Sequence, residues 1–272
     1  MNTYQYYLSK QYDIIQSNLQ KLFDNNTVVD DALHDFRVAL RRFLTIFNII
    51  FKLSNPDENI TQALFFIKSV RLESNHLRDL EVLKDNIYNH NSPLNEFDLF
   101  KSEIINYIDK IFSKEFSNFV SIVNTNEFQH SLNNLLTFSH NSSIDIDFLL
   151  IYSKRIKIIT KTFNTVPLDD ETIHKIRIEL KKIRYISEML SLFDEDITNR
   201  LKAVQELLGK YNDLKNNIEI LNSFINKKSG SRTLWYAIGY YHHLFLSSKF
   251  DLYPKIIKKL PKSIKLFSHI AS

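Results

Sequence analysis

Residues 34–42, HDFRVALRR, and residues 174–182, HKIRIELKK, are two copies of one pattern. Each copy begins with histidine and has basic residues three, seven and eight positions later, and the copies lie 140 residues apart in a chain of 272. On an α-helix, which advances about 100° per residue, the histidine and the basic residues at the third and seventh positions fall on one face. The apolar residues fall on the opposite face: Phe36, Leu40, Phe43, Ile46, Phe47 and Ile50 in the first copy, and Ile176, Leu180, Ile183, Ile186 and Leu190 in the second. The pattern therefore predicts two amphipathic helices, each with one apolar and one cationic face.

A second pair of matching segments follows the first pair. The series Lys68, Arg71, Asn75, Arg78 and Asp79 has the spacing of Lys202, Gln205, Gly209, Asn212 and Asp213, at an offset of 134 residues. Two matches in the same order and at nearly the same offset indicate an internal duplication, with halves of about 1–140 and 141–272. We expect the two aspartates to orient basic side chains or to join helices.

The rest of the chain also has the pattern of helices, because apolar residues recur at steps of three and four. We expect helices over about 3–24, 30–53, 57–90, 94–139 with a break at 124–126, 145–164, 169–194 and 195–226. A turn at 227–231 precedes a helix to about 248, and a Lys-rich segment with prolines ends the chain. With only three glycines, the chain excludes Gly-rich nucleotide-binding loops and disfavours multistranded β folds. The sequence predicts an all-α fold.

Composition narrows the class of protein further. The chain has no cysteine, which excludes disulfides, zinc–cysteine sites and thiol catalysis. The net charge of +4 is too mild to indicate a nucleic-acid binder by itself. The N-terminal stretch MNTYQYYLSKQYD has neither a basic nor an apolar signal region, and no apolar run approaches the ~20 residues of a membrane span. We expect a cytoplasmic protein that does not enter the membrane.

The cationic faces indicate an anionic ligand. Arg37 and Arg41 are like charges four residues apart, and such a pair costs a helix about 0.2–0.5 kcal/mol, whereas a solvated face usually mixes signs. The pattern also occurs twice, and the partner segments 68–79 and 202–213 have polar stripes of their own. Arginine binds two phosphate oxygens with its planar fork and lysine adds a mobile charge, so phosphate groups suit these faces.

Other interpretations of the same residues stay open at this point. A metal site on His34 and His174 is disfavoured, because a cation beside several guanidinium groups is repelled and no carboxylate lies three or four residues after either histidine. Single-stranded nucleic acid would favour aromatic residues between the basic ones, and only Tyr185 has such a position. An ordinary solvated basic face is the simplest alternative.

Four segments of the chain resemble the CHAD domain family. They are HDFRVALRR at 34–42, LRDLEVL at 77–83, HKIRIELKKIRY at 174–185 and LKAVQELLGKYNDL at 201–214, and they follow the family's order along nearly the whole chain. The resemblance implies one domain over 1–272, built as two pseudo-symmetric four-helix units that face each other across a central basic pore or groove. It also implies binding of inorganic polyphosphate and association with polyphosphate granules.

The resemblance implies polyphosphate-binding roles at His34, Arg37, Arg41, Arg42, Arg78, His174, Arg177, Lys181, Lys182, Arg184, Tyr185, Lys202 and Asn212. Helical phase and local charge add Lys68, Arg71, Lys154, Arg155 and Lys157. The first copy departs from the family pattern at Leu44, where a basic residue is usual.

The resulting hypothesis is a stand-alone, non-enzymatic polyphosphate-binding protein without a cofactor or a bound metal, whose site would also accept phosphate or sulfate. The alternative is an enzyme that acts on polyphosphate or phosphohistidine through His34 or His174.

Overall fold

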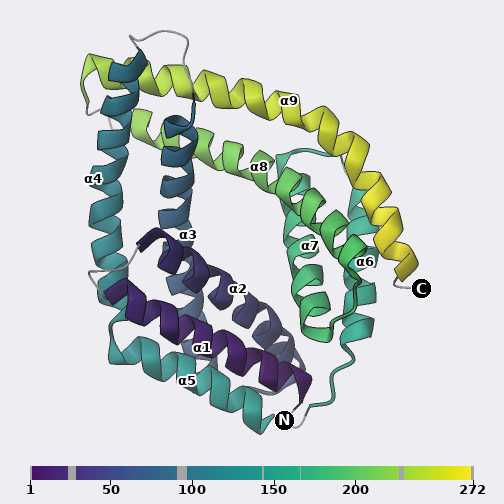
Figure 1. Cartoon of the computed structure of the whole chain (residues 1–272). Coiled ribbons are helices and arrows are strands. Elements are labelled where there is room, and N and C mark those ends of the chain that lie inside the picture. The colour runs from purple at the N-terminus through teal and green to yellow at the C-terminus, as the bar shows by residue number, and fades with distance from the viewer. Residues whose placement is uncertain are drawn as a thin grey trace. The chain divides into compact units, whose positions relative to one another are not determined.

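The computed structural model describes residues 2–23, 29–90, 97–142, 144–165, 167–226 and 230–270. Within these ranges the chain forms α-helices and no strand (Figure 1), which confirms the predicted all-α class. The helices are α1 (Thr3–Phe23), α2 (Val29–Leu53), α3 (Glu58–Tyr88), α4 (Phe97–Val123), α5 (Asn126–Asn141), α6 (Phe148–Thr165), α7 (Asp170–Leu190), α8 (Glu195–Asn226) and α9 (Arg232–Ile270).

The helices divide between two compact units. Unit 1 comprises Met1–Arg78, Glu115–Phe148 and Arg184–Leu192, and unit 2 comprises Asp79–Lys114, Leu149–Ile183 and Phe193–Ser272. This division by contact differs from the division by sequence repeat, because α3, α4 and α7 each have residues in both units. The pseudo-symmetric duplication and the basic pore stay predictions.

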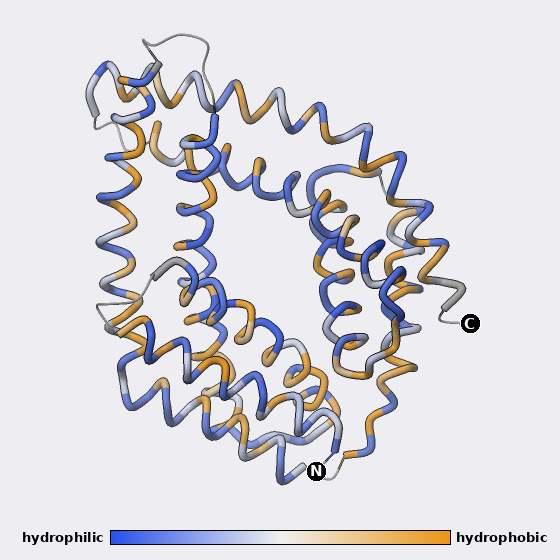
Figure 2. Tube along the Cα trace, in the orientation of Figure 1, coloured by the Kyte–Doolittle hydropathy of each residue, from blue (hydrophilic) through white to orange (hydrophobic). Residues whose placement is uncertain are grey.

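The apolar face of α2 forms the centre of unit 1. Phe36, Leu40, Phe43, Phe47 and Ile50 are all fully buried, as their helical spacing predicted. Phe36 packs edge-on against Phe119 of α4, with 5.7 Å between ring centroids. Burial of each such side chain contributes about 1.5–3 kcal/mol. Because this face packs in the core, the spacing of the polar residues places them on the opposite face of α2. Figure 2 shows hydrophilic and hydrophobic residues alternating along the helices.

Unit 2 has a core of its own. Leu80 and Leu83 of α3, Ile104 of α4, Leu221 of α8 and Ile238 of α9 belong to one buried apolar cluster. The N-terminal part of α7 also buries the predicted residues Ile176, Leu180 and Ile183 in unit 2. Each unit thus has an apolar interior against which its share of the basic residues is positioned.

Several helix ends coincide with polar capping residues. Asp57, Asp169 and Asp194 each accept a hydrogen bond from a backbone N–H three residues later, at 2.8–2.9 Å, at the starts of α3, α7 and α8. The predicted breaks at 54–56 and 124–126 are confirmed by the ends of α2 and α4. The predicted breaks at 24–27 and 91–93 lie outside the described residues, and the turn at 227–231 lies partly outside them.

Two predicted helix ends were wrong. The helix expected to end near residue 194 ends at Leu190, because Ser191 adopts a φ of 52° and the Leu192 N–H donates to Ser187 O at 3.1 Å, which closes the helix. The helix expected to end near 248 continues to Ile270 with Pro254 and Pro261 inside it. Each proline removes one helical hydrogen bond. The helix curves (Figure 1), and its residues Ile256, Leu260, Ile264 and Phe267 are buried, so packing outweighs the loss of these hydrogen bonds.

Candidate functional site

Two arginines of α2 converge on one neutral side chain of α3. Arg37 Nη2 and Arg41 Nη2 both donate to Asn75 Oδ1, at 3.3 and 3.0 Å. Arg37 is only 6% exposed, although it carries a charge. The Asn75 amide orients both guanidinium groups and neutralises neither of them. The like charges that the sequence placed on one face are therefore held together by the fold.

Further cationic or polar residues of unit 1 surround this pair. Burial lowers the pKa of Arg71, and the charge of Arg41 lowers it further. Burial of part of the imidazole lowers the pKa of His34, and Arg78, Arg37 and Arg41 add to this effect while Asp35 opposes it. We call His34, Arg37, Arg41, Arg71 and Arg78, with Asn75, the first cluster. At roughly 4–8 Å and an effective dielectric constant near 20, each close pair of like charges costs about 2–4 kcal/mol before screening.

A related arrangement, the second cluster, lies on α7 and α8 in unit 2, and it consists of His174, Arg177, Lys181 and Asn212. His174 Nδ1 lies 2.6 Å from Asn212 Oδ1, and an oxygen acceptor there requires the proton on Nδ1. Arg177 Nη2 lies 4.0 Å from Asp213 Oδ1. This position agrees with the expectation that the aspartate orients a basic side chain. Gln205 donates instead to the buried Leu180 carbonyl at 2.8 Å, so it joins α8 to α7.

The two clusters use corresponding positions of the sequence repeat. The charge of Arg78 lowers the pKa of His34 in the first cluster. Asn212, which occupies the same place in the second motif pair, is hydrogen-bonded to His174. Spacing along the chain predicted these residues to share stripes, and the structure brings them together within each unit. The difference is one of charge, because an arginine in the first cluster corresponds to a neutral amide in the second.

Three residues predicted to contact the ligand form a separate group in unit 1. Arg42 Nη2 and Arg184 Nε lie 3.0 and 3.3 Å from the Glu188 carboxylate. Both guanidinium groups lie near the Tyr185 ring, at 5.8 and 5.1 Å from its centroid. Tyr185 is only 1% exposed, so the structure places it in the core and does not present its ring to a ligand. Helical phase put Tyr185 on the cationic face, but packing by neighbouring helices buries it.

The predicted residues of α6 also lie apart from the clusters. Arg155 Nη1 and Lys182 Nζ contact the two oxygens of Glu179 at 2.7 and 2.5 Å, which ties α6 to α7. Burial raises the pKa of Glu179, but the hydrogen bonds from Lys182 and Arg155 outweigh burial and hold the pKa below its usual value. Lys154 and Lys157 are exposed on α6, and Lys202 is exposed on α8.

The sequence analysis did not identify Glu188 and Glu179, the two carboxylates that form ion pairs with predicted site residues. Glu188 follows Arg184 by four residues and Glu179 precedes Lys182 by three, so both helical ion pairs could have been found from spacing. Their longer-range partners, Arg42 and Arg155, have no such signal because they come from other helices.

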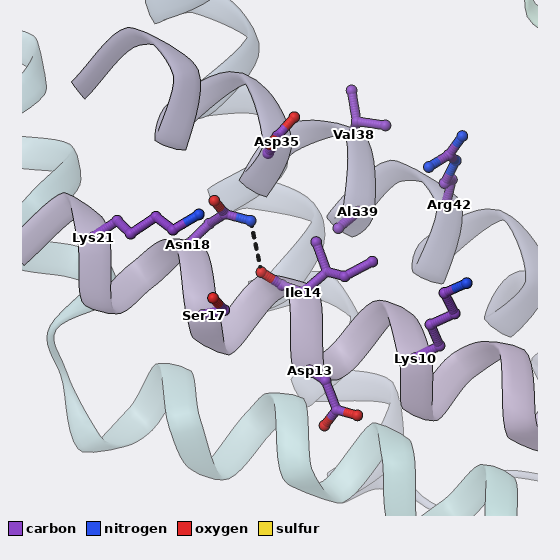
Figure 3. Close-up of a pocket in the computed structure, with 10 residues that line it drawn as sticks. All are labelled: Lys10, Asp13, Ile14, Ser17, Asn18, Lys21, Asp35, Val38, Ala39 and Arg42. Atoms are coloured by element: carbon purple, nitrogen blue, oxygen red, sulfur yellow. Dashed lines mark hydrogen bonds between the residues drawn. The ribbon is translucent and has the colours of Figure 1, made fainter. Parts of the chain in front are cut away.

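A groove of about 520 Å³ between α1 and α2 contrasts with the clusters (Figure 3). Lysines and aspartates both line it, among them Lys10, Asp13 and Asp35, and its buried Asn18 donates to the Ile14 carbonyl at 2.8 Å. The groove is therefore lined by charges of both signs, and Arg42 is among its lining residues. In the described part of the chain, no group of three or more His, Cys, Asp or Glu side chains could hold a metal ion. No helix in that part is long and apolar enough to cross a membrane.

Comparisons with known proteins identify relatives of this chain. The sequence model of the CHAD domain matches residues 7–222. The crystal structure of the CHAD domain from the plant Ricinus communis is similar, with a TM-score of 0.80 and 17% identity, over 97% of this chain and 90% of that one. PptA from Streptomyces chartreusis has a TM-score of 0.68 and 14% identity, over 99% and 97% of the two chains. No curated protein matches the sequence.

Proposed function

Because the chain belongs to the CHAD domain family, we propose that it is a non-enzymatic protein that binds inorganic polyphosphate through its two basic clusters. The observation that carries the proposal is the convergence of Arg37 and Arg41 on the neutral Asn75, with Arg71 and His34 close by. Repulsion among these groups opposes the empty state, and a polyanion would relieve it.

The chemistry of the first cluster suits several linked phosphates more than a single small anion. Guanidinium groups bind phosphate oxygens in pairs, and each helical turn raises the next basic residue by about 5.4 Å. Successive turns of α2 and α3 therefore offer cations in a row, and a linear polyanion can contact several of them at once. Neutralisation of its charges releases counterions, which adds a favourable term that a monovalent anion lacks.

The histidines support binding in this proposal. The lowered pKa of His34 keeps the imidazole neutral near pH 7, where it can donate one N–H to a phosphate oxygen. His174 uses Nδ1 on Asn212, which fixes its ring and leaves Nε2 as the other polar atom. We also propose a cytoplasmic location in association with polyphosphate granules.

A binding experiment with a chain-length readout tests the proposal. Long-chain polyphosphate is titrated into the protein, with RNA and DNA as competitors, and the polyphosphate is afterwards run on a gel. The expected result is saturable binding that nucleic acid competes with poorly, and a chain length that does not change. Absence of binding, or preference for nucleic acid, would overturn the proposal, and shortened chains would favour the enzymatic alternative.

Matched variants separate the site from net charge. Arg41→Gln/Arg78→Gln removes two charges of the first cluster, and Lys110→Gln/Lys258→Gln removes two charges from exposed positions on α4 and α9. The proposal requires that only the first double variant lose most of its affinity.

A further inference from the structure

The polar face of α2 extends beyond the repeated motif. After His34, Arg37 and Arg41 the same face continues through Thr45, Asn48 and Lys52, in steps of three or four residues. Lys52 follows His34 by 18 residues, which is five helical turns, so the two have the same phase and lie about 27 Å apart along the axis. The motif therefore occupies only the first half of a longer polar face.

The intervening residues keep this face polar and uncharged. Thr45 Oγ1 donates to the Arg41 carbonyl at 2.8 Å, and the Asn48 amide donates to the Leu44 carbonyl. Both side chains are half-buried, whereas Lys52 is exposed. Leu44, where the family has a basic residue, is 1% exposed and belongs to the core. Between Arg41 and Lys52, α2 itself has no acidic residue.

Lys68 of α3 joins the first cluster to Lys52. Lys68 precedes Arg71 of the first cluster by three residues on α3, so the two share a face of that helix. Partial burial lowers the pKa of Lys68, and the charges of Arg71 and Lys52 lower it further. Its Nζ lies 5.7 Å from the Phe65 ring centroid, so the aromatic ring supports the ammonium on one side. Cations of α2 and α3 therefore follow one another from the first cluster to the end of α2.

The second copy of the motif has no such continuation. At the positions that correspond to Thr45, Asn48 and Lys52, α7 and the residues after it have Tyr185, Glu188 and Leu192. Tyr185 is buried, and Glu188 is negative and engages Arg42 and Arg184. A ligand that follows α7 in this direction would meet a carboxylate.

We propose that Lys52 and Lys68 form an outer subsite that continues the first cluster and makes the protein select long polyphosphate chains over short ones. The inference rests on the proposed function. A chain must span roughly 27 Å to contact His34 and Lys52 together, and a chain of a few phosphates can occupy only one end of the face. A structural role for Lys52 is the competing explanation, because a lysine in the last turn of a helix interacts favourably with the helix dipole.

The test compares two ligand lengths in one double variant. Dissociation constants for long-chain polyphosphate and tripolyphosphate are measured by calorimetry at low salt for the wild type, Lys52→Gln/Lys68→Gln and the control Lys110→Gln/Lys258→Gln. The expected result is a loss of about fivefold or more for the long chain and less than about twofold for tripolyphosphate, with little change in the control. The salt dependence of long-chain binding should also become shallower.

The possible outcomes separate the outer subsite from polyphosphate binding by the first cluster. Unchanged long-chain affinity in Lys52→Gln/Lys68→Gln, or an equal loss for both ligands, overturns the outer subsite while Arg41→Gln/Arg78→Gln still reports on the first cluster. Absence of long-chain binding in the wild type overturns both. A lower melting temperature with unchanged length selectivity assigns Lys52 to the helix end alone.

Discussion

The first and second clusters share one sequence pattern and differ in the side chains that contact their histidine and arginines. In the first cluster two arginines share a neutral amide, and a further arginine faces the histidine. In the second cluster Asn212 holds the histidine and Asp213 lies 4.0 Å from Arg177. Both helices have a buried apolar face, whereas the residues of their polar faces differ. The fold therefore depends on both copies alike, and anion binding is expected to depend more on the first.

The largest expected effect is on polyphosphate affinity, in two double variants that each remove two charges from one cluster. Arg41→Gln/Arg78→Gln should weaken long-chain polyphosphate binding about 100-fold, and Arg177→Gln/Lys181→Gln about tenfold. Contacts to charged groups contribute about 1.5–3 kcal/mol, and an arginine binds phosphate oxygens in pairs whereas Lys181 is a single point charge. Titration calorimetry measures both. Arg37 is left intact because its burial makes a substitution hazardous for folding. Equal losses in the two variants would contradict the asymmetry.

Ligand-dependent stability sharpens the same comparison. At 100 times its dissociation constant, polyphosphate should stabilise the wild type by about 2.7 kcal/mol, which corresponds to a rise of about 5–10 °C in Tm for a chain of this size. Phosphate and sulfate should give a smaller rise, and chloride the smallest. Arg41→Gln/Arg78→Gln should lose most of the polyphosphate increment. A thermal-shift series would contradict this if variant and wild type rose equally.

A carboxylate outside both clusters should affect stability and leave binding unchanged. Glu179→Gln leaves Arg155 and Lys182 without this carboxylate, and should destabilise the protein by about 1–3 kcal/mol at pH 7, since Glu179 and Arg155 are largely buried. The Glu179 pKa is lowered in the folded state, so its contribution is complete above the unfolded pKa and is lost as pH falls through the folded pKa. Denaturation at pH 7 and pH 3 measures this. If Glu179→Gln weakened polyphosphate binding, Arg155 and Lys182 would again be assigned to the residues that bind the ligand.

The smallest expected effect is a proton linked to binding at His34. Arg37, Arg41 and Asp35 of α2 and Arg78 of α3 act on this imidazole, and burial with the three arginines holds its pKa below 6.5. A bound polyanion would offset the arginines and raise that pKa, so affinity should increase a few-fold as pH falls from 7.5 to 5.5, with proton uptake. His34→Asn should flatten this dependence more than His174→Asn does. Proton uptake unchanged in His34→Asn would exclude the linkage.

The sequence predicted which face of a helix a residue lies on more reliably than which other helix that residue contacts. Phe36 and Phe47 were placed in the core by period alone, and Arg37 and Arg41 on the opposite face, because helical phase follows from spacing. Phase does not say which other helix covers a residue, so Tyr185 was expected on the cationic face and is buried. The same limit applies at the end of the chain, where proline predicted a helix end and distant packing kept α9 intact.

The pairing of Arg155 with Glu179 could not be predicted because it joins two helices. The local ion pair of that network, Glu179 with Lys182, has a helical spacing of three residues, but the sequence analysis assigned Lys182 to the ligand. Basic residues that look equivalent in sequence thus differ in their contacts, because Arg41 donates to an amide oxygen whereas Arg42 and Arg155 contact carboxylates.

The salt dependence of polyphosphate binding tests the central claim, that the α2 and α3 cations form the main polyanion site, most directly. Dissociation constants for long-chain polyphosphate are measured between about 50 and 200 mM NaCl for the wild type and Arg41→Gln/Arg78→Gln. We expect the logarithm of the association constant to fall steeply and linearly with the logarithm of the salt concentration in the wild type. In the variant this slope should be shallower by about one to two. A flat response in the wild type, or the same slope in both proteins, would contradict it.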